Sequence, residues 1–299
     1  MRILISGGSG LIGSALTPYL KSQGHTVISL VRRPARNDQE VTWNPARHEI
    51  PAHALDNIDA IINLSGAGVG DRRWTKSYKQ QILQSRLDAT NTLVEAIAQS
   101  SAKPRVLLNG SAIGFYGDRG EERVTEDSPR GAGFLADVVE QWEAAAVKAS
   151  AFGVRVALLR TGLVLTPKGG AFAKLLPLFK LGLGGKIASG KQFWSVISLT
   201  DEVRAIEFAL THEIHGAVNL TIPQPPRNSE VTKVLSRLLR RPAFVAVPGF
   251  ALDIVLGEFA SDITTGAAVI PQKLIDAGFT WKHSTVDLAI AAAVLGETA

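Results

Sequence analysis

The pattern of apolar and polar residues at the start of the chain alternates between two periods. Residues 2–6 form a short, continuous apolar run, as in a buried strand. After a glycine-rich turn, apolar residues recur at helical spacing, and Gly24 closes this stripe as a C-cap glycine would. A second apolar run follows at residues 26–31. This order predicts a strand, a turn, a helix and a second strand, joined as one βαβ unit.

The same alternation continues through the first half of the chain. We expect further strands at residues 41–43, 58–64, 105–109 and 154–159, and helices at about 76–98 and 134–150. Strands that alternate with helices are typical of a parallel sheet covered on both faces. The predicted fold class is therefore α/β, a Rossmann-type doubly wound parallel sheet.

The turn after the first strand has the spacing of a nucleotide-binding loop. Its glycines fit G-x-x-G-x-x-G and also G-x-G-x-x-G, and they join a predicted strand to a predicted helix. Backbone N–H groups and the positive end of the helix dipole then converge on one spot, which favours a pyrophosphate. We predict that the dinucleotide contacts Gly7, Gly8, Ser9, Gly10, Leu11, Ile12 and Gly13.

Two arginines, Arg32 and Arg33, follow the second predicted strand, where an NAD site would place a carboxylate. A carboxylate accepts a hydrogen bond from the ribose 2′-OH, whereas an arginine binds a 2′-phosphate. Because Pro34 follows, a solvated loop is the alternative. The arginines favour NADP(H) as the cofactor.

Two more predicted strands end in small and polar residues. The carboxyl ends of parallel strands meet at one edge of the sheet, so these residues should line the same crevice as the glycine turn. We place the ribose and nicotinamide side of the cofactor beside Asn63, Leu64, Ser65 and Gly66. Ser111 is expected to contact the cofactor near the reacting carbon.

One arginine on the long helix, Arg86, is also a candidate, because the start of that helix borders the crevice. We expect it to bind an anionic group of the cofactor or the substrate; an ion pair with a structural acid is the alternative.

Composition excludes several classes of function. The 299 residues contain no cysteine, which excludes disulfides and thiolate metal sites, and the six histidines lack metal-ligand spacing. The net charge of +5 is scattered, so we expect no nucleic-acid partner. The first strand leaves no room for a signal peptide and no apolar run has membrane length, so we expect a cytoplasmic protein without a membrane partner.

The character of the chain changes after Thr166, where glycines and prolines divide it into short segments. We expect residues 1–165 to form an NADP-binding Rossmann domain, to which residues 191–222 return. Residues 166–190 and 223–299 are expected to form a smaller C-terminal substrate-binding region.

Several longer motifs resemble the extended short-chain dehydrogenase/reductase superfamily, and more narrowly its atypical epimerase-family, or YfcH-like, branch. They lie at residues 72–75, 85–86, 111–118, 125–127, 142–143, 159–162 and 181–185. Together they are specific and span most of the chain. The resemblance implies a Rossmann-type fold, an NAD(P) cofactor and substrates that are often sugar nucleotides.

The chain departs from this superfamily at its usual acid–base pair, the Tyr and Lys of a Y-x-x-x-K motif. None of the three tyrosines has a lysine four residues later, and the helix that should carry the motif reads FLADVVEQWE. The branch also usually carries Gly-Gln-Arg before Pro271, where this chain has Gly266, Ala267 and Ala268.

The candidate replacement is Tyr116, five residues after Ser111 on the same loop, with its phenol directed into the crevice. We therefore predict Ser111 and Tyr116 as catalytic residues, although substrate contact or packing is an equal alternative for Tyr116. Asp118, Glu126 and Asp127 are further candidates for an acid or base, with a solvated loop as the alternative.

Two functions agree with these observations. One is an NADP(H)-dependent oxidoreductase or epimerase that acts on a small molecule, for which a nucleotide sugar is one candidate class. The other is an NADP(H)-sensing protein with little or no activity that acts through a partner. The sequence leaves a homodimer open.

Overall fold

The computed structural model describes residues 1–244 and 257–296. Its centre is a parallel sheet of seven strands in the order β10-β7-β5-β4-β1-β2-β3. The connections reverse direction between β1 and β4, which is the switch point where such sheets bind ligands. The doubly wound α/β class is confirmed. The strands are β1 (Arg2–Ser6), β2 (Thr26–Val31), β3 (Glu40–Thr42), β4 (Ala60–Asn63), β5 (Val106–Ala112), β7 (Arg155–Thr161) and β10 (Gly216–Leu220).

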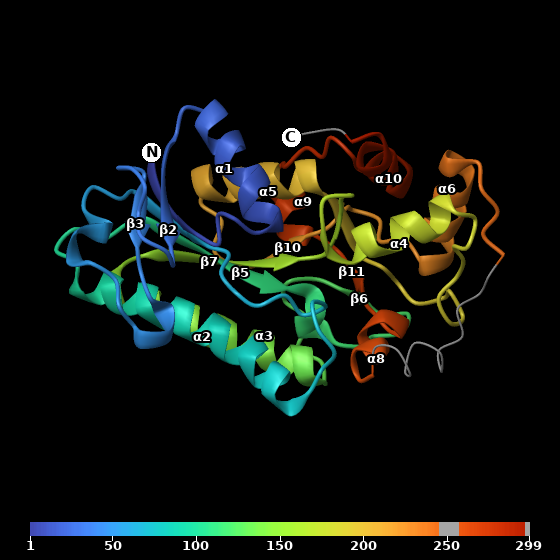
Figure 1. Ribbon diagram of the computed structural model, residues 1–299, viewed down its shortest axis with the longest axis horizontal. Helices are drawn as coiled ribbons and strands as arrows, with labels where there is room; N and C mark the ends of the chain where they lie inside the picture. Colours follow the sequence, from blue (N-terminus) through green and yellow to red (C-terminus); the bar gives the residue numbers. More distant parts are fainter. Residues whose placement is uncertain (245–256, 297–299) are drawn as a thin grey trace.

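Helices cover both faces of this sheet (Figure 1). On one face lie α1 (Leu11–Ser22) and α5 (Leu199–Thr211), packed on side chains such as Ile3 and Ile5. On the other lie α2 (Lys76–Gln99) and α3 (Phe134–Val147), packed on side chains such as Leu4. Burial on both faces explains why the strands are continuous apolar runs in the sequence.

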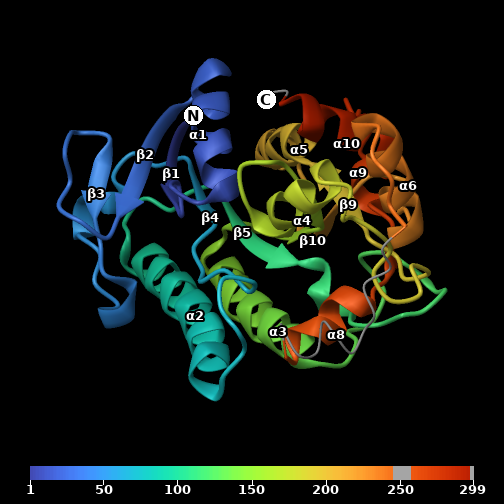
Figure 2. The same cartoon turned by 45° about the vertical axis from the view of Figure 1, so that its right-hand side comes forward.

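A second, smaller core lies beside the sheet, on the side away from β3 (Figure 2). It contains α4 (Gly170–Lys180), α6 (Asn228–Leu239) and α10 (Val286–Leu295), with the two-stranded ladder of β8 (Leu163–Leu165) and β9 (Val196–Ser198). Thus β10 extends the main sheet, whereas β9 pairs outside it. The remaining elements are η1 (Pro45–Arg47), η2 (Ala52–Leu55), η3 (Ile113–Tyr116), β6 (Arg123–Val124), η4 (Lys148–Phe152), α8 (Phe259–Thr264), β11 (Ala268–Val269) and α9 (Gln272–Asp276).

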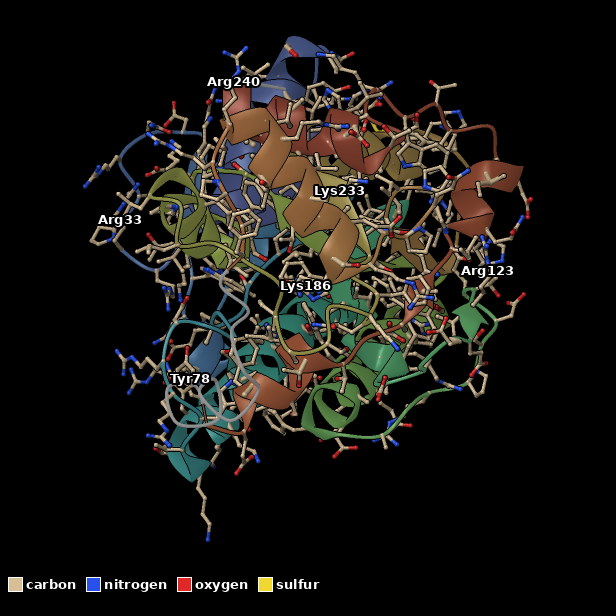
Figure 3. All side chains as sticks on the ribbon, turned by 90° about the vertical axis from the view of Figure 1, so that its right-hand side faces the viewer. Arg33, Tyr78, Arg123, Lys186, Lys233 and Arg240 are labelled. Atoms are coloured by element: carbon tan, nitrogen blue, oxygen red, sulfur yellow. The ribbon has the colours of Figure 1, made fainter. Side chains whose placement is uncertain are left out.

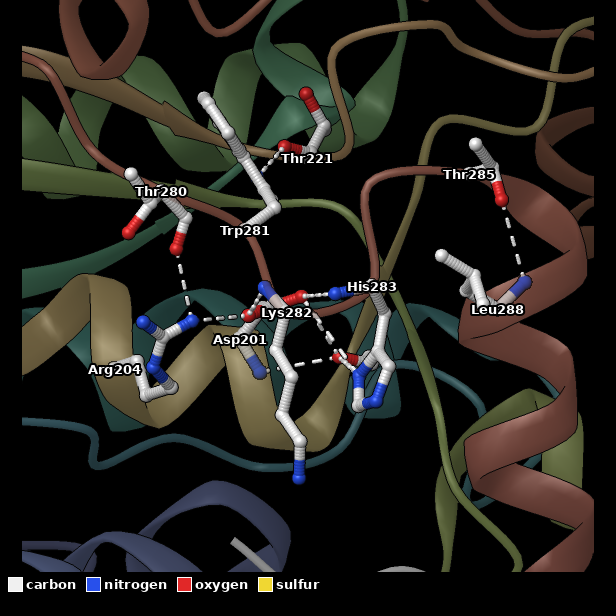
Figure 4. A network of polar contacts seen from close by, with 10 residues as sticks. Asp201, Arg204, Thr221, Thr280, Trp281, Lys282, His283, Thr285 and Leu288 are labelled. Atoms are coloured by element: carbon white, nitrogen blue, oxygen red, sulfur yellow. Dashed lines mark hydrogen bonds and ion pairs between the residues drawn. The ribbon is translucent and has the colours of Figure 1, made fainter.

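One buried carboxylate, that of Asp201 at the start of α5, joins the C-terminal segment to the main sheet (Figure 4). Its Oδ1 accepts from the backbone N–H of Lys282 and from Arg204 Nη1, both at 2.8 Å. Its Oδ2 accepts from the backbone N–H of His283, also at 2.8 Å. Segments about eighty residues apart in sequence are therefore held together at one wholly buried side chain.

We predict that Asp201→Ala lowers the free energy of unfolding by about 3 kcal/mol, because it leaves buried N–H groups and a guanidinium without their acceptor. Urea unfolding followed by circular dichroism measures this change. The control is Asp38→Ala on an exposed loop, which should change the value by less than about 0.5 kcal/mol. Equal effects of the two substitutions would contradict the assignment.

Candidate active site

The glycine turn between β1 and α1 is tight and lies against the loop after β4. Gly7 has a φ of 74°, in the left-handed region, and a Cβ there would lie 2.6 Å from the carbonyl of Leu64. A Cβ at Gly13 would collide with the carbonyl of Gly7. The Gly10 N–H donates to that same carbonyl at 2.9 Å. Glycine is therefore required at positions 7 and 13 by the close approach of backbone atoms.

The N-terminus of α1 is left without a cap. Gly10 at the N-cap has no side chain to accept from the first N–H groups, and the first turn contains no acidic residue. Ser9 and Gly10 are exposed, so an anion can reach this turn. The N–H groups and helix dipole there fit a pyrophosphate, as the dinucleotide prediction requires.

The two arginines after β2 have different surroundings. Arg33 forms a two-pronged ion pair with Glu40 of β3, at 2.7 and 2.6 Å, and lies at the edge of the molecule in Figure 3. The Arg33 guanidinium lowers the pKa of Glu40 to about 2. Arg32 is exposed and has no hydrogen bond or ion pair with residues 1–244 or 257–296. Of the two predicted contacts, Arg32 is thus the one available to a ligand.

At the end of β4, Asn63 is wholly buried and points into the fold. Its Nδ2 donates to Thr90 Oγ1 at 3.0 Å and to Asn109 Oδ1 at 2.7 Å. Its Oδ1 accepts from Ser6 Oγ at 2.7 Å and from the backbone N–H of Ser65 at 3.2 Å. This placement differs from the predicted cofactor contact, because the amide ties β1, β4, β5 and α2 together. The following residues, Leu64, Ser65 and Gly66, do reach the surface.

Ser111 and Tyr116, predicted as catalytic, belong to one buried polar network. Ser111 Oγ donates to Glu143 Oε1 at 2.5 Å. Arg160 donates to both oxygens of Glu143 at 2.8 Å and to Tyr116 Oη at 2.9 Å. Tyr116 Oη donates in turn to Asn219 Oδ1 at 2.7 Å. The network joins α3 to the ends of β5, β7 and β10.

The burial of this network differs from the prediction. The Tyr116 side chain has no exposed surface and Ser111 only 6%, so neither hydroxyl is presented to the crevice. Burial raises the pKa of Tyr116 above its ordinary value. For Arg160, burial alone would lower the pKa, but the hydrogen bonds and charge of Glu143 raise it overall. The geometry assigns these residues a structural role.

The other acidic candidates, Glu126, Asp118 and Asp127, have different surroundings. Glu126 is buried, and its carboxylate accepts from the backbone N–H groups of Asn219 at 3.0 Å and Gln272 at 3.1 Å. Burial raises the pKa of Glu126, and the backbone N–H groups partly offset that effect. Asp118 and Asp127 lie exposed on their loop.

Apolar packing covers one face of α3, the helix on which the family resemblance places a Y-x-x-x-K motif. Phe134 and Val138 pack in one apolar cluster with Trp74, Tyr78 and Ile82. Tyr78, labelled in Figure 3, donates its hydroxyl to the carbonyl of Gly68 at 2.5 Å. The face of α3 that would carry a proton donor is thus apolar.

Arg86 is a half-buried cation beneath the loop after β4. Its Nη1 donates to the carbonyls of Ala67 at 2.9 Å and Ile82 at 2.8 Å, and its guanidinium lies 5.0 Å from the Trp142 ring. Burial lowers its pKa to about 10. No carboxylate in the described part of the chain pairs with it, so the structural ion pair considered as an alternative does not form there. Arg86 thus brings an uncompensated positive charge to the crevice.

Sequence reasoning missed a second pair of residues, Thr161 at the end of β7 and Glu202 on α5. Thr161 Oγ1 donates to Glu202 Oε1 at 2.8 Å. Glu202 has no exposed surface, and its Oε2 has no hydrogen-bond partner among the described residues. Burial raises the pKa of Glu202 to about 8, and the Thr161 hydrogen bond only partly offsets this effect. An acid in the first turn of a helix ordinarily complements the dipole, so the sequence carries no signal that distinguishes Glu202.

Within residues 1–244 and 257–296, no three His, Asp or Glu side chains gather as a metal ion would need. Over the same residues, no helix has both the length and the apolar character to span a bilayer.

This fold and crevice define a nucleotide-binding protein of the short-chain dehydrogenase/reductase type. Residues 3–221 match the NAD dependent epimerase/dehydratase family, and residues 247–293 match a domain of unknown function, DUF1731. The chain belongs to this epimerase family, as its motifs predicted.

Relatives are similar along almost the whole chain. The epimerase family protein Mb2239 of Mycobacterium bovis is 42% identical over 290 residues, 96% of each chain. The crystal structure of the human epimerase family protein SDR39U1 with NADPH has a TM-score of 0.90 and 31% identity, and the match covers 99% of both chains. A nucleoside-diphosphate sugar epimerase from Corynebacterium glutamicum has a TM-score of 0.82 and 31% identity over all of this chain and 59% of its own.

We predict that Tyr116→Phe lowers the free energy of unfolding by about 1–3 kcal/mol, because Asn219 Oδ1 and one N–H of Arg160 lose their buried partner. NADPH affinity should not change. Urea unfolding and NADPH titration, performed on the same preparation, measure the two quantities. A fall in NADPH affinity at unchanged stability would instead place the phenol at the ligand.

We also predict that Glu202 makes stability depend on pH. Its pKa of about 8 in the folded protein exceeds the ordinary 4.5, so above pH 4.5 the unfolded chain loses a proton that the folded protein keeps. Its contribution to stability is therefore fully present below pH 4.5 and is lost as the pH rises to about 8. Urea midpoints at pH 5, 6.5 and 8 should fall more steeply for the native chain than for Glu202→Gln. The same dependence of the urea midpoint on pH in both proteins would contradict the burial of an uncharged carboxyl.

Proposed function

We propose that the chain binds NADP(H) across the carboxyl edge of its sheet and catalyses hydride transfer on a small molecule, as an oxidoreductase or epimerase. The observation that carries this proposal is the uncapped N-terminus of α1 behind a turn that needs glycine at positions 7 and 13. The human relative crystallised with NADPH supports it. When bound, the cofactor supplies the hydride chemistry, and the protein supplies orientation and the proton.

Arg32 supports NADP(H) over NAD(H). It follows β2, where the adenosine ribose lies in this fold class, and no described carboxylate or carbonyl engages it. Arg33 would have to leave Glu40 to reach a 2′-phosphate, so its contribution should be smaller.

Arg86 supports an anionic ligand on the nicotinamide side. Its side chain packs under Gly66, where a Cβ would lie 3.1–3.3 Å from it, and it has no acid partner among the described residues. A phosphate or carboxylate of the substrate, or a cofactor phosphate, has the complementary charge. A nucleotide sugar is one substrate class with such a group.

One observation favours the second candidate function, an NADP(H) sensor that acts through a partner. The apolar cluster on α3 and the burial of Tyr116 remove the proton donors expected on that side of the crevice. A sensor would bind NADPH as tightly as an enzyme and would turn over no substrate. Mass spectrometry of small molecules that copurify with the protein distinguishes the two: a bound substrate or product supports the enzyme.

We predict that Arg32→Ala weakens NADPH binding at least tenfold and leaves NADH binding unchanged, because only NADPH carries the 2′-phosphate. A charge-assisted hydrogen bond contributes about 1.5–3 kcal/mol, which corresponds to roughly tenfold or more in Kd. Calorimetric titration with both cofactors measures the preference.

The matched control is Arg36→Ala, which removes an exposed arginine of the same loop and should leave both affinities unchanged. Equal affinity of the native chain for NADPH and NADH would overturn the NADP(H) assignment.

A further inference from the structure

We propose that Glu202 and Thr161 are the proton-transfer pair of the crevice: Glu202 stores the proton, and the Thr161 hydroxyl passes it to or from the substrate oxygen. This inference rests on the proposed NADP(H) function. It places the acid–base group on the face of the sheet that α5 covers. The apolar face of α3, on the other side of the sheet, carries no such group.

Strand register places the Thr161 hydroxyl on that side. Arg160, one residue earlier on β7, turns toward α3 and pairs with Glu143. Successive side chains on a strand point to opposite faces, so Thr161 turns toward α5, where it reaches Glu202. Thr161 is half-buried and ends its strand beside Ala112, the last residue of β5. Its hydroxyl therefore lies between a buried acid and the carboxyl edge of the sheet.

The strand order places this pair on the nicotinamide side of the crevice. The glycine turn that fits the pyrophosphate follows β1, and β4, β5 and β7 succeed β1 in that direction. At about 4.8 Å per strand, β7 is roughly 14 Å from β1. The adenosine half lies on the other side, toward β2 and Arg32.

The unpaired Oε2 of Glu202 is the second observation. Buried polar atoms are nearly always hydrogen-bonded, and one without a partner is costly. A buried polar atom in that state calls for a reason, and a role in proton transfer supplies one. Its partner Thr161 connects it to the crevice.

Among the residues that the structure describes, no ionised group neutralises Glu202. The strands β5, β8 and β9, which pack against α5, carry no titratable side chain. On β7, Arg160 turns to the opposite face, and Arg155 binds carbonyls at the far end of α5. The remaining charged or titratable groups on and around the helix have other contacts. They include Asp201, Arg204 and Glu207 on α5, His212 at its end, Tyr19 and Lys21 on α1, His25 beside Glu207, and Lys282 and His283 at the C-terminal segment.

The chemistry balances for the oxidation of an alcohol by NADP⁺. The substrate C–H bond breaks with its electron pair, which moves with the hydrogen to the nicotinamide ring. The substrate O–H bond breaks, and its proton moves to the Thr161 oxygen while the Thr161 proton moves to the Glu202 carboxylate. The products are a carbonyl compound, NADPH and uncharged Glu202. Reduction is the reverse of this step.

The pair therefore responds to the redox state of the cofactor. The oxidised nicotinamide ring carries a positive charge and the reduced ring carries none. A nearby positive charge favours the carboxylate form of Glu202, whereas a neutral ring leaves the acid protonated. Binding of NADP⁺ should thus release the Glu202 proton, and binding of NADPH should not.

Calorimetric titration at pH 7 in phosphate and in Tris buffer measures proton release, because the two buffers differ in ionisation enthalpy. The measured quantity is the number of protons released when NADP⁺ binds minus the number released when NADPH binds. Both cofactors carry the 2′-phosphate, so its protonation cancels in this difference. We expect the native chain to release more protons with NADP⁺, by a substantial fraction of one proton per site. Glu202→Gln should abolish this difference.

Matched variants test each member of the pair. Glu207→Gln makes the same change on the same helix and should retain the native difference. Thr161→Val removes the hydrogen bond that favours the carboxylate and should reduce the difference, whereas Thr161→Ser should restore it.

The same proton release for Glu202→Gln and the native chain, or no difference between the cofactors in the native chain, would overturn the proton-transfer pair while leaving the NADP(H) site intact. If neither cofactor binds the native chain, the proposed function fails and this inference fails with it.

Discussion

The buried ion pair between Arg160 and Glu143 is the interaction on which the end of the sheet depends. Arg160 is 4% exposed, and its guanidinium would cost several kcal/mol without a counter-charge, so the carboxylate of α3 must lie beside β7. Ser111 bonds to Glu143 and Tyr116 to Arg160, and these bonds satisfy further polar atoms of the ion pair. Unpaired polar groups at that depth would be costly. The same requirement therefore positions α3 and removes two hydroxyls from the crevice.

Local periodicity was sufficient to predict the fold. Strands buried on both faces produce continuous apolar runs, and helices on their faces produce stripes, so β1, β4, β5 and β7 and the helices between them followed from the sequence. The glycine turn was predictable for the same reason, since strand, turn and helix are adjacent in the chain. The pairing of β9 with β8 was not predictable, because it depends on the packing of the second core around α4, α6 and α10.

Side-chain direction could not be read from the sequence. Asn63 and Ser111 stand at strand ends and Tyr116 ends η3, yet each side chain points inward to a partner between 32 and 103 residues away. Arg86 was a candidate because the start of its helix borders the crevice, and its role as a ligand contact stays a prediction. The orientation of a polar residue is set by the nearest unsatisfied buried partner, and that partner is known only once the sheet order is known.

Loss of the Y-x-x-x-K motif removes proton donors from α3 and does not by itself remove the means of proton transfer. An acid–base group must lie within reach of the substrate and must exchange its proton near neutral pH. A residue on either side of the nicotinamide can meet both conditions. On α3, apolar packing excludes such a group. On α5, burial keeps Glu202 uncharged near neutral pH, and Thr161 connects it to the carboxyl edge of the sheet. In the proposed proton transfer, a carboxyl that burial makes a weaker acid would take the place of a phenol assisted by a cation.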